Sequence, residues 1–500
     1  MCVNTLIKCI EDERVQCIGY SYCEYLGPRH WFQFADDTAL VTTSEEDNQA
    51  LLDVFTKWCR WAGFQVRVNK CSRFGIKHNG KKATQFKPYL KVNNQMIPQV
   101  EIHSNIYIHS ESFQYLGKQF NYKMDMVVIE QELEYDLLEY LEKINRLPLH
   151  PRNKILIITK YVYSKLRWRL SIYRLSQSWV EQHLDDKFIS YVKRWLHFHK
   201  GANLTHLKLA SSKFGVGLQL ASDVHRYCKL SIRKILSKSI NNDIRCLFNL
   251  TKFNNVQTDC LIYNNDNPRS ALKQQIENTV VEHLSTLKEQ NTIMKHVRQV
   301  ASPKHITMWD NICRQMPKNI FVFVRRALIH SLPNNSNLCR WGKRDNPLCE
   351  LCYSNKQTQL HMLSACPVSA DEGRYTWRHD SILYTLLHYI SQLKEYGFRI
   401  YADLDNFDNP NELFHSMRPD IVLIKDDRIF ILELTCCFET NSEKSRNLKI
   451  NKYGDIQNDC KKRFRHWRKI FVEFTTLGLV TKHIDDLYSV FKKQTLIIRE

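Results

Sequence analysis

Residues 418–433 read RPDIVLIKDDRIFILE, and this stretch decides the fold expected for the C-terminal part of the chain. Two apolar runs, Ile421 to Ile424 and Ile429 to Leu434, flank a polar turn, which predicts a β-hairpin. Asp420 precedes the first strand and Glu433 closes the second, so both carboxylates are expected near one end of the hairpin. Paired carboxylates are costly unless a cation lies between them, and hard oxygen ligands suit Mg²⁺. The stretch therefore predicts a magnesium site, and the alternative is a surface hairpin with ordinary charged ends.

A helix that carries lysines is expected after this hairpin. It begins near Ser442 and places Lys449 and Lys452 about one turn apart. Two acidic metal ligands followed by a lysine form the arrangement of a metal-dependent nuclease. For each lysine the alternative is a solvated helix face.

Length and composition bound the remaining interpretations. A chain of 500 residues is too long for one core, so two to four domains are expected. The formal net charge of +20 favours a polyanionic partner such as nucleic acid. Seventeen cysteines without an apolar signal segment indicate a reducing compartment, and no apolar run approaches membrane-spanning length. We therefore expect a nuclear or cytoplasmic protein that is not secreted and has no membrane partner.

An adjacent pair of aspartates lies in an expected hairpin near the N-terminus. Residues 30–34 read HWFQF and residues 38–42 read TALVT, with Asp36 and Asp37 in the turn between them. Carboxylates at such a tip can hold the Mg²⁺ ions of a polymerase, and the alternative is an ordinary polar turn. The sequence next predicts a helix that Ser44 caps and Gly63 ends, a strand over 64–68, and a short strand pair over 113–120.

The pattern is helical from about residue 124 to residue 238, with basic and aromatic side chains interleaved. The run Arg167, Trp168 and Arg169 is one example. Cations neutralise phosphates and aromatic rings stack on unpaired bases, so this region is a candidate for nucleic-acid binding. The alternative is a solvated basic face over an aromatic core. Helices are also expected from about residue 269 to residue 331.

Four potential zinc ligands follow at close spacing: Cys349, Cys352, His361 and Cys366. Two ligands close in sequence followed by a second pair would give tetrahedral Zn²⁺ a closed shell of three sulfurs and one nitrogen. Such a small loop would scarcely order without a metal, which favours structural zinc. Cys339 is an alternative thiol for this site.

The ordered set of FADD at 34–37, NKC at 69–71 and YLG at 115–117 resembles the reverse transcriptase palm of non-LTR retrotransposons. With the cysteine-histidine cluster and the RPD of 418–420 after it, the chain is most similar to the class with a C-terminal restriction-like endonuclease. The resemblance implies an RNA-directed DNA polymerase joined to a DNA endonuclease, with element RNA and target DNA as partners. It further implies that Asp36 and Asp37 bind the Mg²⁺ of polymerisation and that Lys70 lies near the incoming nucleotide.

For the C-terminal part, the resemblance implies that Asp420 and Glu433 bind Mg²⁺. Restriction-like folds usually carry a lysine two residues after the second acid, where this chain has Thr435, whereas the non-LTR subgroup carries its lysines in the next helix. Lys449 is therefore expected to stabilise or assist the attacking water, with Lys452 as the second candidate. Two further residues, Arg378 and His379, look like a basic helix start that contacts DNA phosphate, and an ordinary helix start is the alternative.

The resemblance gives an α/β multidomain architecture. The expected parts are a partial right-hand palm (1–123), a helical thumb (124–238), a helical linker region (239–335), a zinc cluster (336–370) and a restriction-like α/β nuclease (371–500). The family has a further catalytic aspartate on an earlier strand, and only 35 residues precede Asp36, so we expect an N-terminally truncated, incomplete polymerase. The implied reaction is nicking of target DNA followed by reverse transcription primed from the nick. Two alternatives remain, a non-catalytic nucleic-acid-binding protein from a decayed or domesticated element and a nuclease unrelated to transposition.

Overall fold

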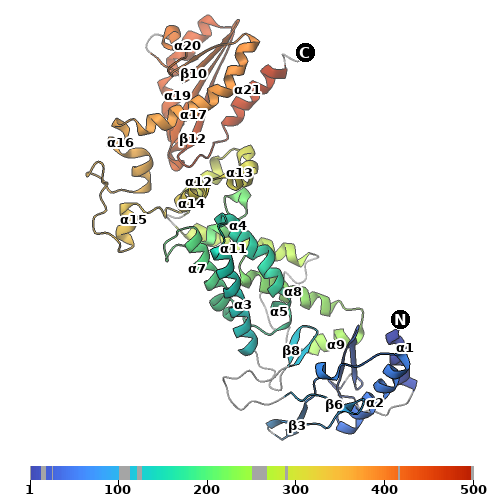
Figure 1. Cartoon of the computed structure of the whole chain (residues 1–500). Coiled ribbons are helices and arrows are strands. Elements are labelled where there is room, and N and C mark those ends of the chain that lie inside the picture. Colours follow the sequence, from blue (N-terminus) through green and yellow to red (C-terminus); the bar gives the residue numbers. More distant parts are fainter. Residues whose placement is uncertain are drawn as a thin grey trace. The chain divides into compact units, whose positions relative to one another are not determined.

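The computed structural model of the chain is shown in Figure 1. It describes residues 2–12, 19–24, 26–80, 82–100, 113–120, 127–250, 267–287, 291–414 and 417–496. The chain divides into two compact units. The first comprises Met1–Leu147, Leu156–Phe188 and Gln219–Gln274, and the second comprises Pro148–Ile155, Ile189–Leu218 and Gln275–Glu500. No helix in the described ranges is both long enough and apolar enough to cross a membrane.

The N-terminal part of the first unit is built around two helices and a series of short hairpins. Helix α1 packs on α2, and Trp58 Nε1 donates a hydrogen bond of 3.0 Å to Thr5 Oγ1 across this contact. The expected cap of α2 is confirmed, because Ser44 accepts from the amide of Asp47 and Gly63 ends the helix with a φ of 72°. The elements of this part are α1 (Cys2–Asp12), β1 (Trp31–Phe34), β2 (Asp37–Leu40), α2 (Glu45–Ala62), η1 (Val68–Lys70), β3 (Gly75–Asn79), β4 (Lys82–Phe86), β5 (Lys91–Val92), β6 (Gln95–Met96), β7 (Phe113–Tyr115) and β8 (Lys118–Phe120).

The strand expected over 64–68 is wrong. The amide of Phe64 donates to the carbonyl of Cys59 at 2.8 Å, so this residue completes the end of α2 and does not start a strand. The ring of Phe64 also stacks on Trp58 with a centroid distance of 5.4 Å. The apolar alternation that suggested a strand reflects Val66 and Val68, which pack into the small apolar clusters beneath α2.

The helical region of the first unit confirms the helical pattern expected there, although residues 124–126 lie outside the described residues. Leucines at helical spacing, among them Leu133, Leu137 and Leu141 of α3, are fully buried. The elements are α3 (Val127–Arg146), η2 (Ile158–Val162), α5 (Tyr163–Ile172), α6 (Gln177–Trp179), η3 (Val180–Asp185), α8 (Ala221–Ser237) and α9 (Asn242–Leu250). Three further helices have residues in both units: α4 (Pro151–Ile157), α7 (Asp186–Trp195) and α11 (Pro268–Thr286).

The second unit begins with short helices around a buried arginine. Arg325 is 1% exposed, and its Nη1 donates to the carbonyls of Phe214 at 2.6 Å and Gly215 at 3.2 Å. Its Nη2 lies 2.9 Å from Cys313 Sγ. The guanidinium therefore connects the turn at Phe214 and Gly215 to the helices that carry Arg325 and Cys313. The helical elements here are η4 (Thr205–Lys208), η5 (Ser211–Lys213), α12 (Thr292–Val300), α13 (Pro303–Gln315), α14 (Lys318–Ala327), α15 (Asn335–Arg340), η8 (His361–Ala365) and α16 (Pro367–Asp371).

A four-stranded sheet forms the C-terminal part of the second unit. Its order is β12-β11-β10-β9, in which β10 is antiparallel to both neighbours and β12 is parallel to β11. The strand bounds are β9 (Arg399–Ala402), β10 (Ile421–Lys425), β11 (Arg428–Cys437) and β12 (His466–Thr475). The hairpin expected at 418–433 is therefore confirmed. Asp426 forms its tip with a φ of 49°, a conformation that Asp tolerates better than most residues.

Both faces of this sheet are covered by helices, as Figure 1 shows. One core cluster joins Ile421 and Leu423 to α17 and α21, and the other joins Val422 and Ile424 to α20. Burial on both faces explains why the strands read as continuous apolar runs. The helical elements are α17 (Arg374–Ile390), η9 (Ser391–Tyr396), α18 (Asn411–Phe414), η10 (Glu439–Asn441), α19 (Ser442–Lys452), α20 (Gly454–Arg463) and α21 (Ile484–Leu496).

Candidate functional site

The register of the C-terminal hairpin brings the two expected carboxylates together. Ile421 pairs with Leu432, so Asp420 lies opposite Glu433 at the end of the β10–β11 ladder. Asp420 is 5% exposed and Glu433 is 1% exposed. Two acidic side chains this deeply buried require compensation from cations or donors, because burial disfavours the charged form.

Lys449 provides part of that compensation from α19. Its Nζ donates to Glu433 Oε2 at 2.8 Å and to Asp420 Oδ2 at 3.3 Å. Lys452 is exposed, and its Nζ lies over the ring of Tyr453, 4.9 Å from the centroid. Of the two candidate lysines, the structure brings Lys449 to the carboxylates.

Asp420 has two further partners. The amide of Leu434 donates to Asp420 Oδ2 at 2.6 Å, and His379 Nε2 lies 3.5 Å from the same oxygen. Burial would raise the pKa of Asp420, but the hydrogen bond from His379 and the charge of Lys449 outweigh burial and lower the pKa. Asp420 is therefore held as a carboxylate.

His379 and Arg378, expected at a DNA phosphate, are both engaged within the protein. His379 Nδ1 lies 2.9 Å from Asp380 Oδ1, and its Nε2 lies 3.3 Å from the carbonyl oxygen of Leu434. Burial alone would lower the pKa of His379, but hydrogen bonding to Asp420 outweighs it and raises the pKa to about 9. Arg378 Nη2 donates to the carbonyl of Leu363 at 2.9 Å.

Only one of the two carboxyl oxygens of Glu433 has a hydrogen-bond donor. Among the described residues, nothing donates to its buried Oε1. Burial and the nearby charge of Asp420 raise the pKa of Glu433 to about 8, although Lys449 opposes this effect. Both carboxylates also line a small cavity of about 10 Å³, walled mainly by apolar side chains. A buried carboxylate oxygen without a donor, beside a second carboxylate, fits a hard cation such as Mg²⁺.

A second buried glutamate, which sequence reasoning missed, lies on the neighbouring strand. Glu473 is 1% exposed, and Arg446 Nη1 donates to its Oε1 at 3.0 Å. Thr481 Oγ1 donates to Oε2 at 2.5 Å, and His483 Nδ1 lies 2.7 Å from Oε2. Both oxygens of Glu473 therefore have partners, and its pair with Arg446 anchors α19 to the sheet. A lone acid inside the apolar run FVEF was the available signal.

The four predicted zinc ligands converge. The ligand atoms of Cys349, Cys352, His361 and Cys366 all lie within 4.8 Å of one another. Cys349 Sγ and Cys366 Sγ are 4.0 Å apart, close to the separation of about 3.8 Å that Zn–S bonds of about 2.3 Å give at a tetrahedral centre. Hydrogen bonds, first from Ser354, lower the pKa of the Cys352 thiol to about 6, which favours the thiolate that zinc binds. The donor set and spacing fit Zn²⁺.

One tyrosine connects this cluster to α17. The amide of Cys366 donates to the hydroxyl of Tyr375 at 3.0 Å, and that hydroxyl lies 3.3 Å from the carbonyl oxygen of His361. The start of α17 is therefore fixed to two of the four predicted ligand residues.

In the first unit, the aspartate pair lies at the exposed end of the β1–β2 hairpin. Phe34 pairs with Asp37, so Asp37 is the first residue of β2, and Ala35 and Asp36 form the turn. Burial, and then the charge of Asp37, raise the pKa of Tyr115, which places the 115–117 turn near the aspartates. Lys70 is exposed in η1.

The basic and aromatic run of α5 has mixed surroundings. Arg167 is exposed, whereas Arg169 forms an ion pair with Asp136. Trp168 is 51% exposed and its Nε1 donates to the carbonyl of Leu116 at 3.2 Å. Arg167 and the outer face of Trp168 remain accessible to a partner.

Comparisons with known proteins agree with the N-terminal motifs. Residues 3–120 match the family described as reverse transcriptase (RNA-dependent DNA polymerase). The chain is 22% identical over 361 residues to the Retrovirus-related Pol polyprotein from type-1 retrotransposable element R2 of Nasonia vitripennis. This alignment covers 70% of the chain and 32% of the relative, so the chain spans about a third of that protein's length. Residues 3–120 are therefore similar to a reverse transcriptase domain, and a longer part of the chain is similar to a retrotransposon Pol polyprotein.

Proposed function

We propose that the chain is the reverse transcriptase and endonuclease portion of a non-LTR retrotransposon polyprotein. Palm residues lie within 1–123, a helical thumb over 124–238, a linker over 239–335 and the zinc cluster over 336–370. Residues 371–500 act as a Mg²⁺-dependent DNA endonuclease of the restriction-like kind. The match of residues 3–120 supports the polymerase, and the name of the curated relative supports the class of element.

The observation that carries the endonuclease is the constellation of Asp420, Glu433 and Lys449. Both carboxylates are buried, one lysine reaches both, and Glu433 Oε1 has no donor among the described residues. The order of the surrounding elements also agrees with the restriction-like α/β nuclease expected over 371–500. Helix α17, three antiparallel strands, α19 and a parallel strand follow one another along the chain. A purely structural ion pair would be expected to satisfy both oxygens of a buried glutamate, as happens at Glu473.

In this proposal Asp420 and Glu433 would hold Mg²⁺, and the ion when bound would neutralise charge on the scissile phosphate. Burial would lower the pKa of Lys449, but the charges of the two carboxylates outweigh it and raise the pKa. Lys449 therefore acts as a cation beside the phosphate and not as a general base. His379 is a positioning residue, because its contact with Asp420 fixes the orientation of that carboxylate.

The test of the endonuclease is nicking of supercoiled duplex DNA by the full chain with Mg²⁺. We expect cleavage that Asp420→Ala abolishes while DNA binding persists. If the purified chain binds DNA but does not cleave it with any divalent metal, the alternative of a non-catalytic nucleic-acid-binding protein is correct.

The polymerase is tested separately by primer extension on an RNA template. Where the chain extends the primer, Asp36→Asn and Asp37→Asn should each reduce the rate on the order of 1000-fold, because core catalytic groups act as a unit. Absence of extension by the unmodified chain would reject polymerase activity for this chain and leave the endonuclease unaffected.

A further inference from the structure

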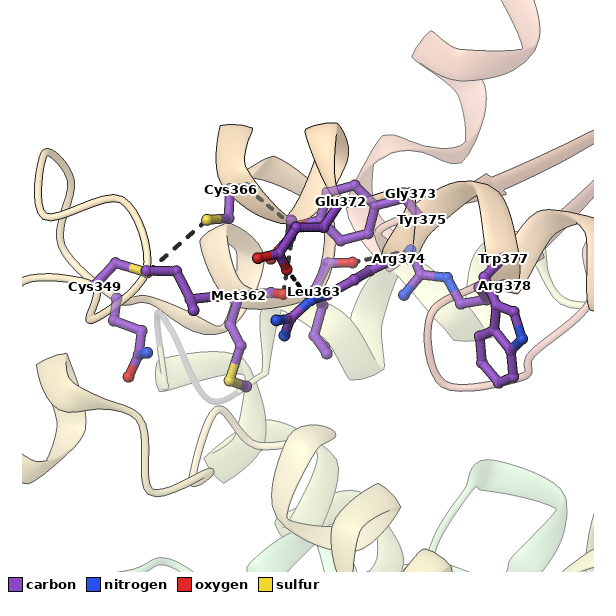
Figure 2. A pocket seen from close by; sticks show the side chains of 13 residues that line it. Cys349, Met362, Leu363, Cys366, Glu372, Gly373, Arg374, Tyr375, Trp377 and Arg378 are labelled. Carbon is purple, nitrogen blue, oxygen red and sulfur yellow. Dashed lines mark hydrogen bonds and ion pairs between the residues drawn. The ribbon is translucent and has the colours of Figure 1, made fainter.

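Two helices carry partners of the candidate nuclease carboxylates, and an arginine connects each helix to neighbouring backbone. On α17, Arg378 Nη2 donates to the carbonyl of Leu363, and both residues line the pocket shown in Figure 2. On α19, Arg446 Nη1 donates to the carbonyl of Phe471 in β12 at 3.0 Å. Since α19 also carries Lys449, the contact of Arg446 bears directly on the candidate nuclease site.

Arg446 meets β12 through three contacts. Besides the carbonyl of Phe471, its Nη1 donates to Glu473 Oε1 at 3.0 Å. Its guanidinium carbon lies 5.5 Å from the centroid of the Phe471 ring. The guanidinium is therefore held by a backbone oxygen, a carboxylate and an aromatic ring, which together fix its position and its direction.

The carboxylate that accepts from Arg446 is itself held in one orientation. Glu473 is 1% exposed, and its other oxygen, Oε2, accepts from Thr481 Oγ1 and lies 2.7 Å from His483 Nδ1. Thr481 is also buried, and its amide donates to the carbonyl of Glu473 at 3.2 Å. Because both oxygens of Glu473 have partners, this side chain offers Arg446 a fixed point on the sheet.

Apolar packing contributes little to the position of α19. Of its eleven residues only Ser442, the first, is buried. Its two apolar side chains are Leu448, which is 62% exposed, and Ile450, which is only partly buried. A helix of this length is marginal by itself and normally depends on an apolar face packed on the core. Polar contacts therefore have to hold α19 on the sheet.

Arg446 and Lys449 lie three residues apart, so both side chains project from the same face of α19. Lys449 Nζ donates to oxygens of Glu433 and Asp420. The same two carboxylates would also hold a cation, and like charges repel. Lys449 therefore needs a support that does not use these carboxylates, and Arg446 provides it.

We propose that Arg446 is a positioning residue for the endonuclease reaction, whose contacts with Phe471 and Glu473 keep Lys449 at the paired carboxylates. This inference rests on the proposed endonuclease. Both acceptors of Arg446 Nη1 belong to the protein. Arg446 therefore affects the rate of cleavage and not the binding of DNA.

The test compares single-turnover nicking of supercoiled DNA by the full chain, by Arg446→Met, by Lys449→Met and by the variant that combines them. Methionine keeps an unbranched stem beside Phe471 and removes the guanidinium. Arg446→Met should nick about 30-fold more slowly with unchanged affinity for DNA, because a group displaced by about 1 Å can lose on the order of 100-fold. The combined variant should nick no more slowly than Lys449→Met, because Arg446 acts only through that lysine.

Four outcomes would overturn the inference. They are an unchanged rate in Arg446→Met, weaker DNA binding by that variant, losses that multiply in the combined variant, and absence of nicking by the unmodified chain. Only the last of these also rejects the proposed endonuclease. Lys444→Met is the matched control, because Lys444 is exposed on the same helix, and it should change nicking less than about 3-fold.

A further variant controls for folding, because Arg446→Met leaves Glu473 buried without its cation. Arg446→Met combined with Glu473→Gln removes both charges and should show the same loss of nicking. Hydrogen exchange in buffer without Mg²⁺ gives a readout that does not depend on cleavage. Protection of the α19 peptide should fall at least about 10-fold in this variant, while peptides of β10 and β11 keep theirs. Unchanged protection of α19 would overturn the proposal.

Discussion

Replacing Glu433 with glutamine should stabilise the metal-free protein while abolishing cleavage. The substitution keeps the shape of a side chain that is 1% exposed and replaces a carboxyl group whose Oε1 has no donor among the described residues. If Glu433 is held for a metal ion, the protein without metal should tolerate the neutral residue better than the native one.

The magnitude follows from the pKa of Glu433, which burial and Asp420 raise from 4.5 to about 8. Between pH 4.5 and pH 8 the unfolded chain has lost this proton and the folded chain retains it. The folded state therefore loses stability as pH rises through this window, by about 3 kcal/mol at pH 7. Glutamine removes that cost but weakens the hydrogen bond with Lys449 by about 1 kcal/mol, leaving a gain of about 2 kcal/mol.

Hydrogen exchange of peptides from β10 and β11, in buffer without Mg²⁺, measures this gain. Protection at pH 7 should rise about 30-fold in Glu433→Gln, which is the equivalent of about 2 kcal/mol. At pH 5 the advantage should vanish, because the cost of the raised pKa of Glu433 is then only about 1 kcal/mol and the weakened hydrogen bond with Lys449 offsets it.

Glu473→Gln is the matched control, since this glutamate is equally buried but both of its oxygens have partners. Breaking its pair with Arg446 should lower stability by about 3 kcal/mol. If Glu433→Gln also lowers protection at pH 7, Glu433 belongs to a satisfied structural ion pair, and the argument for a cation site fails.

Three other substitutions test separate features. Lys449→Met should reduce DNA nicking at least about 100-fold, whereas Lys452→Met, at an exposed position, should change it less than about 3-fold. Cys352→Ser should reduce the zinc bound per chain, measured by atomic absorption, because a structural site needs all four ligands. Gly215→Ala should lower the thermal unfolding temperature by the equivalent of more than about 2 kcal/mol, since a Cβ there would lie 1.9 Å from a backbone oxygen.

Matched variants control these tests. Cys339 lies outside the converging ligands, so Cys339→Ser should retain zinc. A Cβ added at Gly454 would meet no other described atom within 4 Å, so Gly454→Ala should not destabilise the protein. Equal nicking by the two lysine variants would remove Lys449 from the site, and full zinc content in Cys352→Ser would remove that thiol from the cluster. An unchanged unfolding temperature in Gly215→Ala would contradict the close contact.

Short-range signals predicted the C-terminal hairpin and the convergence of the cysteine-histidine cluster. The hairpin followed from two apolar runs around a polar turn, and its register then dictated that Asp420 and Glu433 meet. The spacing of the four predicted zinc ligands along the sequence was also sufficient to predict that they converge, and their ligand atoms lie within 4.8 Å of one another. Such features depend on residues that are close along the chain.

Features that depend on packing between distant segments could not be predicted in the same way. The choice of Lys449 over Lys452 depends on which face of α19 meets the sheet. The contact of His379 with Asp420 joins residues 41 positions apart, and sequence reasoning expected that histidine at a phosphate. The strand expected over 64–68 failed because Phe64 stacks on Trp58 at the end of a helix, a tertiary contact that overrides local alternation.

Helix α17 contacts both candidate metal sites, so the number of residues between its two contacts is constrained. Tyr375 contacts the cluster, and His379, four residues later on the same side of the helix, contacts Asp420. A single residue inserted between them would rotate His379 by about 100° relative to Tyr375 and separate the two contacts. Length variation among related sequences should therefore be absent between Tyr375 and His379, and it should occur in the irregular segment 403–410.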